Sequence, residues 1–330
     1  MGQSCLFIRP AKPWEAARSM PDILITEFMD ETQVDRLATE YDVSYQPDLV
    51  SDQDKIPALM PGVRGLIVRN ATQVRGAVLD AADKLECVGR LGVGLDNIDM
   101  DACADRGIKV YPAIGANSDS VAELAMGAIY SLFRRAYHST DAVIAGKWPR
   151  LELMGREIQG KTLGIIGLGN AGQALAWRAR GNGMRRIAYD PWVAADDPRW
   201  DDCKVERAET LDELLPECDA VSVHVALTDD TTNMFNAETI AKMKDRAILL
   251  NLSRGGIVDE QALVDALKSE KLWGAFTDVF VEEPLTHPNI FEGVPHLICT
   301  PHIGPRTEEG EGKVSTVTAD NVLNCLKGEN

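Results

Sequence analysis

The chain has 330 residues, of which 45% are hydrophobic and 26% charged, and its formal net charge is −17. This length and balance predict a globular protein of two domains, and no apolar run approaches the ~20 residues of a membrane span. The acidic charge argues against a nucleic-acid partner or an anionic membrane partner. The seven cysteines form no Cys-x-x-Cys pair and are odd in number. We therefore expect a cytoplasmic protein without a disulfide framework or a metal site.

The first domain is predicted after a short leader. Residues 1–20 hold only a brief apolar patch, from Cys5 to Ile8, which is too weak for a secretory signal. We expect this leader to be disordered. Short β-rich runs and helical patterns then alternate, which is typical of a parallel α/β domain. Strands are expected at Ile23–Thr26, Val43–Tyr45, Gly65–Val68, Cys87–Leu91 and Ile108–Val110, with helices such as Glu31–Glu40 and Gln73–Ala81.

A second alternating series begins at Lys161. Before it, apolar residues at helical spacing predict one long helix from Ser120 to Ala145. After it, a helical pattern over Val314–Leu326 is expected to pack back on the first domain. Six strands with intervening helices match a doubly wound dinucleotide-binding fold. These strands are expected at Leu163–Ile166, Arg186–Tyr189, Ala220–Val225, Ala247–Asn251, Gly274–Val279 and Leu297–Thr300.

A glycine loop follows the first strand of this second series. Residues 167–172 read GLGNAG and precede a helical run over residues 173–180. A glycine loop in this strand–helix context indicates a dinucleotide site. Gly167 permits the tight turn, Gly169 lets the backbone approach the pyrophosphate, and Gly172 allows close helix–strand packing. The phosphates are expected on the N–H groups at the helix start.

An acidic residue ends the next strand. Asp190 lies 18 residues (190 − 172) beyond Gly172, where a carboxylate accepts hydrogen bonds from the adenosine ribose hydroxyls. It would repel a 2′-phosphate, and the following Pro191 and Trp192 offer no arginine to bind one. NAD is therefore favoured over NADP.

Together these patterns predict an α/β protein of two Rossmann-like or flavodoxin-like domains with doubly wound parallel sheets. The active site is expected in the cleft between them. Residues 21–117 and 304–330 are predicted to form the substrate domain, and residues 118–303 the NAD-binding Rossmann domain.

A series of ordered motifs resembles the D-isomer-specific 2-hydroxyacid dehydrogenase family, nearest to its phosphoglycerate-dehydrogenase-like members. The resemblance extends from Pro21 along nearly the whole chain. Besides the glycine loop, the motifs are VRNAT at 68–72, GRLGVGLDNID at 89–99, NSDSVAE at 117–123, NLSRG at 251–255, DVFVEEP at 278–284 and PHIG at 301–304.

This resemblance implies an NAD-dependent enzyme that interconverts a small 2-hydroxy acid and its 2-oxo acid. His302 would take the hydroxyl proton from the substrate and return it in the reverse direction, as histidine does in general acid–base catalysis. Glu283 would hydrogen-bond the imidazole, orient it and favour its protonated form. Arg254 would bind the substrate carboxylate with its planar, permanently charged guanidinium.

The resemblance also implies the remaining site residues. Substrate contacts are expected from Arg69, Asn70, Val93 and Gly94, with Arg254 and His302. Asp278 is expected to contact the nicotinamide amide. A loop at residues 146–150 would reach a second subunit, which implies a homodimer. The further cofactor-binding residues are Asn170, Ala171, His224, Thr228, Asn251, Ser253 and Gly304.

Arginines beyond the one needed to bind a carboxylate, which we call surplus cations, indicate the charge of the substrate. One positive partner suffices for a monocarboxylate, whereas this sequence offers Arg69, Arg90, Arg150 and Arg306 near the expected cleft. We therefore predict a C3 acid with a second anionic group, of the 3-phosphoglycerate or 3-sulfolactate type. Surface ion pairing of these arginines is the competing interpretation. The alternative functions are a hydroxypyruvate or glyoxylate reductase and, more remotely, an NAD-sensing corepressor without catalysis.

Overall fold

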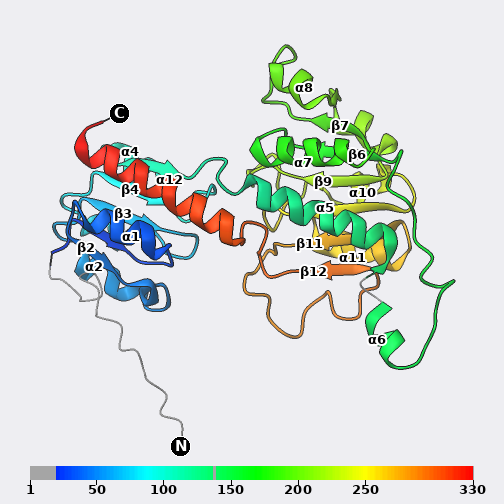
Figure 1. The fold of residues 1–330 in the computed structure, drawn as a ribbon, viewed down its shortest axis with the longest axis horizontal. Coiled ribbons are helices and arrows are strands. Elements are labelled where there is room, and N and C mark those ends of the chain that lie inside the picture. Colours follow the sequence, from blue (N-terminus) through cyan, green and yellow to red (C-terminus); the bar gives the residue numbers. More distant parts are fainter. Residues whose placement is uncertain (1–19, 137–138, 330) are drawn as a thin grey trace, which may run out of the picture. The chain divides into compact units, whose positions relative to one another are not determined.

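The computed structural model describes residues 20–136 and 139–329. The predicted leader, except for Met20, therefore lies outside the described residues. The chain divides into two compact units, which we call unit 1 (Met1–Asn117 with Thr307–Asn330) and unit 2 (Ser118–Arg306). Each unit holds one parallel sheet flanked by helices (Figure 1). This architecture confirms the predicted α/β class with two doubly wound sheets.

Unit 1 contains a five-stranded sheet in the order β2-β1-β3-β4-β5. This order is that of flavodoxin-like folds, in which ligands bind outside the carboxyl ends of the strands. All five predicted strands are present, each within a few residues of its expected bounds. They are β1 (Ile23–Ile25), β2 (Val43–Tyr45), β3 (Gly65–Val68), β4 (Cys87–Arg90) and β5 (Lys109–Pro112).

Alternating side chains of this sheet form two apolar layers. Ile23 and Ile25 of β1 pack with helices α1 and α12 on one face, whereas Leu24 between them packs with α2, α3 and α4 on the other. Both faces are buried because each strand is covered on both sides. The helices of unit 1 are α1 (Glu31–Ala38), α2 (Ile56–Leu59), α3 (Ala77–Asp80), α4 (Met100–Asp105) and α12 (Glu308–Lys327), with 3₁₀ turns η1 (Pro47–Ser51) and η2 (Gln53–Lys55).

Unit 2 contains a seven-stranded sheet in the order β12-β11-β10-β9-β6-β7-β8. Its six predicted strands are present, and β8 is additional. Sequence periodicity could not detect β8, because it is only two residues long and both are exposed. The strands are β6 (Thr162–Ile166), β7 (Arg185–Tyr189), β8 (Glu206–Arg207), β9 (Ala220–Val223), β10 (Ala247–Asn251), β11 (Leu272–Thr277) and β12 (Leu297–Cys299).

Helices also cover both faces of this sheet. Ile165 packs on the side of α5 and α7, which lie together across one face (Figure 1), and Ile166 packs on the side of α10 and α11. The helices are α5 (Ser118–Arg134), α6 (Ser139–Ile144), α7 (Asn170–Gly181), α8 (Pro198–Cys203), α9 (Leu211–Leu214), α10 (Ala237–Lys242) and α11 (Glu260–Lys268), with the 3₁₀ turn η4 (Leu215–Glu217).

Three predicted helices were wrong in extent. The helix expected over Val314–Leu326 begins earlier, because α12 starts at Glu308. The single helix over 120–145 is divided, because α5 ends at Arg134 and Arg135 has a left-handed φ of 51°, which a right-handed helix cannot accommodate. The helix expected from Gln73 begins only at Ala77, since Val74 pairs as a β-bridge with Ile98 and the intervening Gly76 has φ 48°.

Residues 20–136 and 139–329 contain neither a membrane-spanning helix nor a cluster of metal ligands. Their helices are too short or too polar to cross a membrane. Their His, Cys, Asp and Glu side chains form no group of three suited to a metal ion.

Candidate active site

The glycine loop joins β6 to α7 and has the local geometry that a dinucleotide requires. Gly167 has φ 94°, and a Cβ there would lie 2.5 Å from the carbonyl oxygen of His224. A Cβ on Gly172 would lie 2.0 Å from the oxygen of Gly167, whereas one on Gly169 would meet open space. Gly169 also caps α7 without a side chain, so the first N–H groups of the helix face a space that suits an anion.

Asp190 lies directly after β7 and ties the loop to the next strand. Its carboxylate accepts hydrogen bonds from the N–H of Leu168 at 2.8 Å and from the N–H of Trp192 at 3.0 Å. Each carboxylate oxygen retains a second lone pair, because an ionised carboxylate has about four acceptor positions. Asp190 can therefore hold the loop and accept a hydroxyl hydrogen bond at once.

The loop after β10 carries Arg254 and is held by its neighbours. Asn251 donates from Nδ2 to the carbonyl oxygen of Arg254 at 2.9 Å and accepts from the N–H of Ser253 at 3.2 Å. A Cβ on Gly255 would lie 1.9 Å from the carbonyl oxygen of Phe280, so only glycine permits this approach. This contact brings the loop of Arg254 against the segment that leads to Glu283.

Glu283 and His302 form a hydrogen-bonded pair in unit 2. Oε2 of Glu283 lies 2.8 Å from Nδ1 of His302, and its Oε1 accepts from the N–H of Phe280 at 3.0 Å. Burial alone would raise the pKa of Glu283. The hydrogen bonds from His302 and Phe280, with the positive charges of His302 and Arg254, together lower that pKa below its usual value. Glu283 is therefore an ionised acceptor beside the imidazole.

Asp278 holds the loop that carries His302. It is buried, and its carboxylate accepts from the hydroxyl of Thr300 at 2.6 Å, the N–H of Ile303 at 2.8 Å and the N–H of Gly304 at 2.7 Å. Its carbonyl oxygen accepts from the N–H of His302 at 2.8 Å. His302 itself has a left-handed φ of 53°, a conformation that persists only where surrounding contacts impose it. The sequence did not predict that Asp278 holds this loop. The contact with nicotinamide that was expected of Asp278 stays a prediction.

Comparison with known proteins agrees with this geometry. Residues 126–304 match the sequence model of the D-isomer specific 2-hydroxyacid dehydrogenase family, NAD binding domain. An (S)-sulfolactate dehydrogenase of Chromohalobacter salexigens is 48% identical over 93% of this chain and 99% of its own length. The chain belongs to this family. It is accordingly an NAD-dependent 2-hydroxyacid dehydrogenase, as the motifs predicted.

Two further relatives extend the likeness. A hydroxypyruvate reductase of Thermotoga maritima is 40% identical to this chain, over 83% of this chain and 89% of the reductase. The crystal structure of the TT0316 protein from Thermus thermophilus superposes with a TM-score of 0.85, at 32% identity, over 93% of this chain and 97% of that one. The sequence relatives thus show the family, and the superposition shows the fold.

Two further residues that were predicted to bind the cofactor follow β9. His224 has its Nε2 2.8 Å from Oγ of Ser222, and burial lowers the pKa of His224 to about 4, so its ring is neutral at neutral pH. Thr228 donates from its N–H to the hydroxyl of Thr231 at 2.7 Å. Their contacts with NAD stay predictions.

The predicted substrate loop after β3 belongs to unit 1 of the dehydrogenase. Asn70 is exposed at its tip. The carboxylate of the buried Glu27 accepts from the N–H groups of Arg69 at 2.8 Å and Thr72 at 2.9 Å, and Asn97 donates to the oxygen of Thr72 at 2.7 Å. The sequence did not predict that Glu27 and Asn97 hold this loop. Their signal in the sequence is a polar residue soon after a buried strand.

Two of the four surplus cations, Arg69 and Arg90, lie in unit 1 and are buried in different ways. The guanidinium of Arg69 contacts the carboxylate of Glu311 and donates to the oxygen of Phe28 at 3.2 Å, so Glu311 offsets its charge. Arg90 donates from Nη1 to the carbonyl oxygen of Leu91 at 3.0 Å. A Cβ on Gly92 would lie 1.6 Å from that Nη1, so glycine is what lets the guanidinium lie under this loop.

The other predicted substrate residues are more accessible. Val93 is exposed and Gly94 is partly buried in unit 1, whereas Arg150 and Arg306 are exposed in unit 2. Arg306 follows His302 by four positions in the chain. Of the four surplus cations, Arg306 is therefore the one that combines exposure with proximity in sequence to the Glu283–His302 pair.

The Glu283–His302 pair predicts a pH dependence of stability. The folded-state pKa of Glu283 lies below its unfolded value, so the ionised carboxylate contributes stability above its ordinary pKa. That contribution is lost as the pH falls through the lowered folded-state pKa. We expect E283Q to melt at a lower temperature than the parent at pH 7, and the difference to shrink as the pH falls below the ordinary glutamate pKa of about 4.3. Thermal unfolding from about pH 3 to about pH 8, an interval that brackets the ordinary pKa of glutamate, measures this difference.

The same variant tests the pairing with His302. An amide stabilises an imidazolium less than a carboxylate does, so E283Q should lower kcat for oxidation, the direction in which the imidazolium forms. The matched control is E282Q, because Glu282 is the adjacent exposed carboxylate. An equal loss of kcat in E282Q would contradict the assignment of Glu283.

Proposed function

We propose that this dehydrogenase acts on a C3 2-hydroxy acid with a second anionic group, with 3-sulfolactate as the first choice. The observation that carries the proposal is the relative named (S)-sulfolactate dehydrogenase, which matches along 99% of its length. The exposed Arg306, four positions after His302 in the chain, supports it, because a guanidinium binds sulfonate, phosphate or carboxylate oxygens in a planar fork.

His302 is the proposed proton carrier. A carboxylate only accepts hydrogen bonds, so the 2.8 Å contact with Glu283 requires a proton on Nδ1 of His302. The neutral ring then has its lone pair on Nε2, on the opposite side from Glu283. Nε2 can take the proton of the substrate hydroxyl, and Glu283 stabilises the resulting imidazolium.

Arg254 is the proposed anchor of the substrate carboxylate. Its Nη1 donates to the carbonyl oxygen of Ser253 at 2.7 Å, which fixes the plane of the guanidinium. The carboxylate would bind to the other N–H groups of the fork, and its orientation would place C2 and its hydroxyl for proton removal. Val93 and Gly94 of unit 1 are proposed as further carboxylate donors through their N–H groups.

The residues around the glycine loop fit NAD. The open space at Gly169, the uncapped start of α7 and the carboxylate of Asp190 suit a pyrophosphate followed by a ribose diol. NAD, when bound, accepts the hydride that leaves C2. The contacts of Asn170, Ala171, Ser253 and Gly304 with it are part of this proposal.

A panel of 2-oxo acids with NADH tests the substrate class. We expect sulfopyruvate or phosphohydroxypyruvate to be reduced with a kcat/KM at least about tenfold above that of glyoxylate or pyruvate. A charge-assisted hydrogen bond typically contributes ~1.5–3 kcal/mol, and the monoanions lack the second charged group. Initial rates at matched NADH concentration supply the comparison.

Hydroxypyruvate decides between this proposal and the alternative suggested by the second relative. If hydroxypyruvate or glyoxylate is reduced as efficiently as every dianionic acid, the chain is a hydroxypyruvate or glyoxylate reductase instead. R306Q should lower kcat/KM for the dianions alone, whereas R150Q, which removes another exposed arginine of unit 2, is the matched comparison.

A second copy of the chain is the proposed partner. The segment around α6 exposes large apolar side chains, with Ile144 and Leu151 each 80% exposed and Trp148 72% exposed. Contiguous exposed apolar surface of this kind marks interaction sites.

The six described cysteines are free thiols, which supports the proposed cytoplasmic location.

W148D should shift the oligomeric state toward the monomer, because a carboxylate in an apolar interface is desolvated without a partner. Sedimentation or light scattering of the parent should give the mass of two chains. W177D is the control, since Trp177 is a half-exposed tryptophan on α7. A parent protein that is monomeric and fully active would refute the homodimer.

A further inference from the structure

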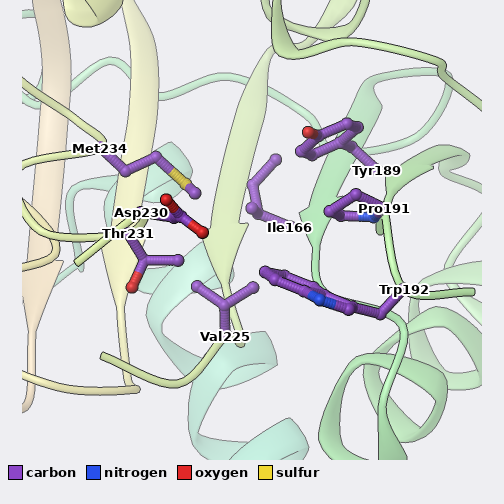
Figure 2. Close-up of a pocket in the computed structure, with 8 residues that line it drawn as sticks. All are labelled: Ile166, Tyr189, Pro191, Trp192, Val225, Asp230, Thr231 and Met234. Atoms are coloured by element: carbon purple, nitrogen blue, oxygen red, sulfur yellow. The ribbon is translucent and has the colours of Figure 1, made fainter. Parts of the chain in front are cut away.

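A cavity of about 330 Å³ lies at the carboxyl ends of β6, β7 and β9 in unit 2. Its volume falls within the range of small-molecule sites. Figure 2 shows its lining, which comes from three strand ends and from the segment after β9. The lining residues are Ile166, Tyr189, Pro191, Trp192, Val225, Asp230, Thr231 and Met234.

The cavity is placed to receive the base of the dinucleotide. Tyr189 and Pro191 flank Asp190 in the chain, and Asp190 is the proposed ribose carboxylate. A base attached to that ribose would therefore enter the adjoining cavity. Its walls are largely apolar, and the exposed indole of Trp192 borders it, which suits the flat faces of a purine.

Two polar side chains on the β9 side of the cavity differ in their availability. The hydroxyl of Thr231 donates to the carbonyl oxygen of Ala226 at 2.7 Å and accepts from the N–H of Thr228 at 2.7 Å. It is therefore committed to its own turn. The carboxylate of the exposed Asp230 points into the cavity in Figure 2.

A carboxylate at this position imposes a chemical requirement on the base. It can only accept hydrogen bonds, so it favours a base that presents an N–H donor. Adenine presents the 6-amino donor, as it does when amino-acid acceptors read it in nucleic acids. A purine with hydrogen at C6 offers no donor at that place, so it would leave the carboxylate without this hydrogen bond.

We propose that Asp230 selects the adenine base of the cofactor by accepting a hydrogen bond from its 6-amino group, while Trp192 packs on the base. This inference rests on the proposed NAD site and adds a determinant of base specificity to it. Asp230 takes no part in the proposed hydride or proton transfer.

The test compares two dinucleotides that differ only at that position, NAD and nicotinamide purine dinucleotide, which carries hydrogen in place of the 6-amino group. Their dissociation constants are measured by calorimetry with the full chain and without substrate. We expect the parent to bind NAD about tenfold more tightly, which is the lower end of the ~1.5–3 kcal/mol for a hydrogen bond to a charged group. D230N should reduce this ratio to about threefold or less, because an amide can present either its oxygen or its NH₂ group.

D229N is the matched control, since Asp229 is the adjacent exposed carboxylate and does not line the cavity. It should keep the parental ratio. Equal affinity of the parent for both dinucleotides, or an unchanged ratio in D230N, would overturn the role of Asp230. Failure of the parent to bind either dinucleotide would instead overturn the proposed NAD site itself.

Trp192 is tested separately. W192A should weaken both dinucleotides by a similar factor of about fivefold or more, because base–aromatic stacking typically contributes ~1–3 kcal/mol. The ratio between the two should stay parental. An unchanged affinity in W192A would overturn the packing of Trp192 on the base and leave the role of Asp230 to its own measurement.

Discussion

Replacement of His302 by alanine is expected to lower kcat by about 10²–10⁴-fold, the usual contribution of general acid–base catalysis. The reason lies in the pairing with Glu283, which leaves Nε2 of the neutral ring as the atom that accepts the substrate proton. Steady-state rates of the H302A variant, in both directions, measure this loss. The affinity for NAD should stay within about threefold of the parent, because such a rate loss arises in proton transfer.

His287 provides the matched control for this variant. It is an exposed histidine of unit 2, so H287A should retain parental kcat. A loss below about tenfold in H302A would contradict the assignment of the base, since it would fall short of the range expected for proton transfer. Calorimetry of NAD binding distinguishes a catalytic defect from a misfolded cofactor domain.

Replacement of Arg254 by lysine should lower kcat/KM for the oxo acid roughly 10²-fold. Lysine keeps the positive charge but loses the planar fork that binds both carboxylate oxygens, and one charge-assisted hydrogen bond contributes ~1.5–3 kcal/mol. Part of the loss should appear in kcat, since a substrate that turns in the site also displaces its C2 hydroxyl from His302.

R185K is the control for this effect. Arg185 opens β7, at the amino end of the sheet, and forms ion pairs with Glu206 at 2.6 Å and with Glu217 at 3.0 Å. Exposed pairs of this kind contribute little, so R185K should keep parental kinetics. Equal kcat/KM in R254K and the parent would show that the carboxylate binds elsewhere.

Local patterns were sufficient for most of the architecture. Short apolar runs between helical patterns located five strands of unit 1 and six of unit 2. A strand buried on both faces is apolar at successive positions, which makes it easy to recognise in the sequence. These patterns failed where the signal was short or was overridden. β8 has two exposed residues, and the left-handed Arg135 ends α5 within an apolar periodicity that continues beyond it.

The site divides in the same way. The glycine loop and Asp190 could be named from sequence, because each has a characteristic place after a strand of this fold. Arg254, Glu283 and His302 could be named because their motifs resemble those of the family. The roles of Asp278 and Glu27 could not be named. The carboxylate of Asp278 accepts hydrogen bonds from N–H groups at residues 303 and 304, and that of Glu27 from N–H groups at residues 69 and 72. These partners are at least 25 positions away in the chain, so they become known only when the chain is folded.

The sequence by itself determined the α/β class, the dinucleotide loop, the preference for NAD and the family, since each depends on residue types at short, regular spacings. Only the tertiary structure decided how these parts are held together. It placed Gly255 against Phe280, set Glu311 on Arg69 and turned Asp230 toward the cavity beside Trp192. The physical reason is that each of these contacts joins segments from different loops or secondary-structure elements, so sterics and charge pairing in the folded chain select them.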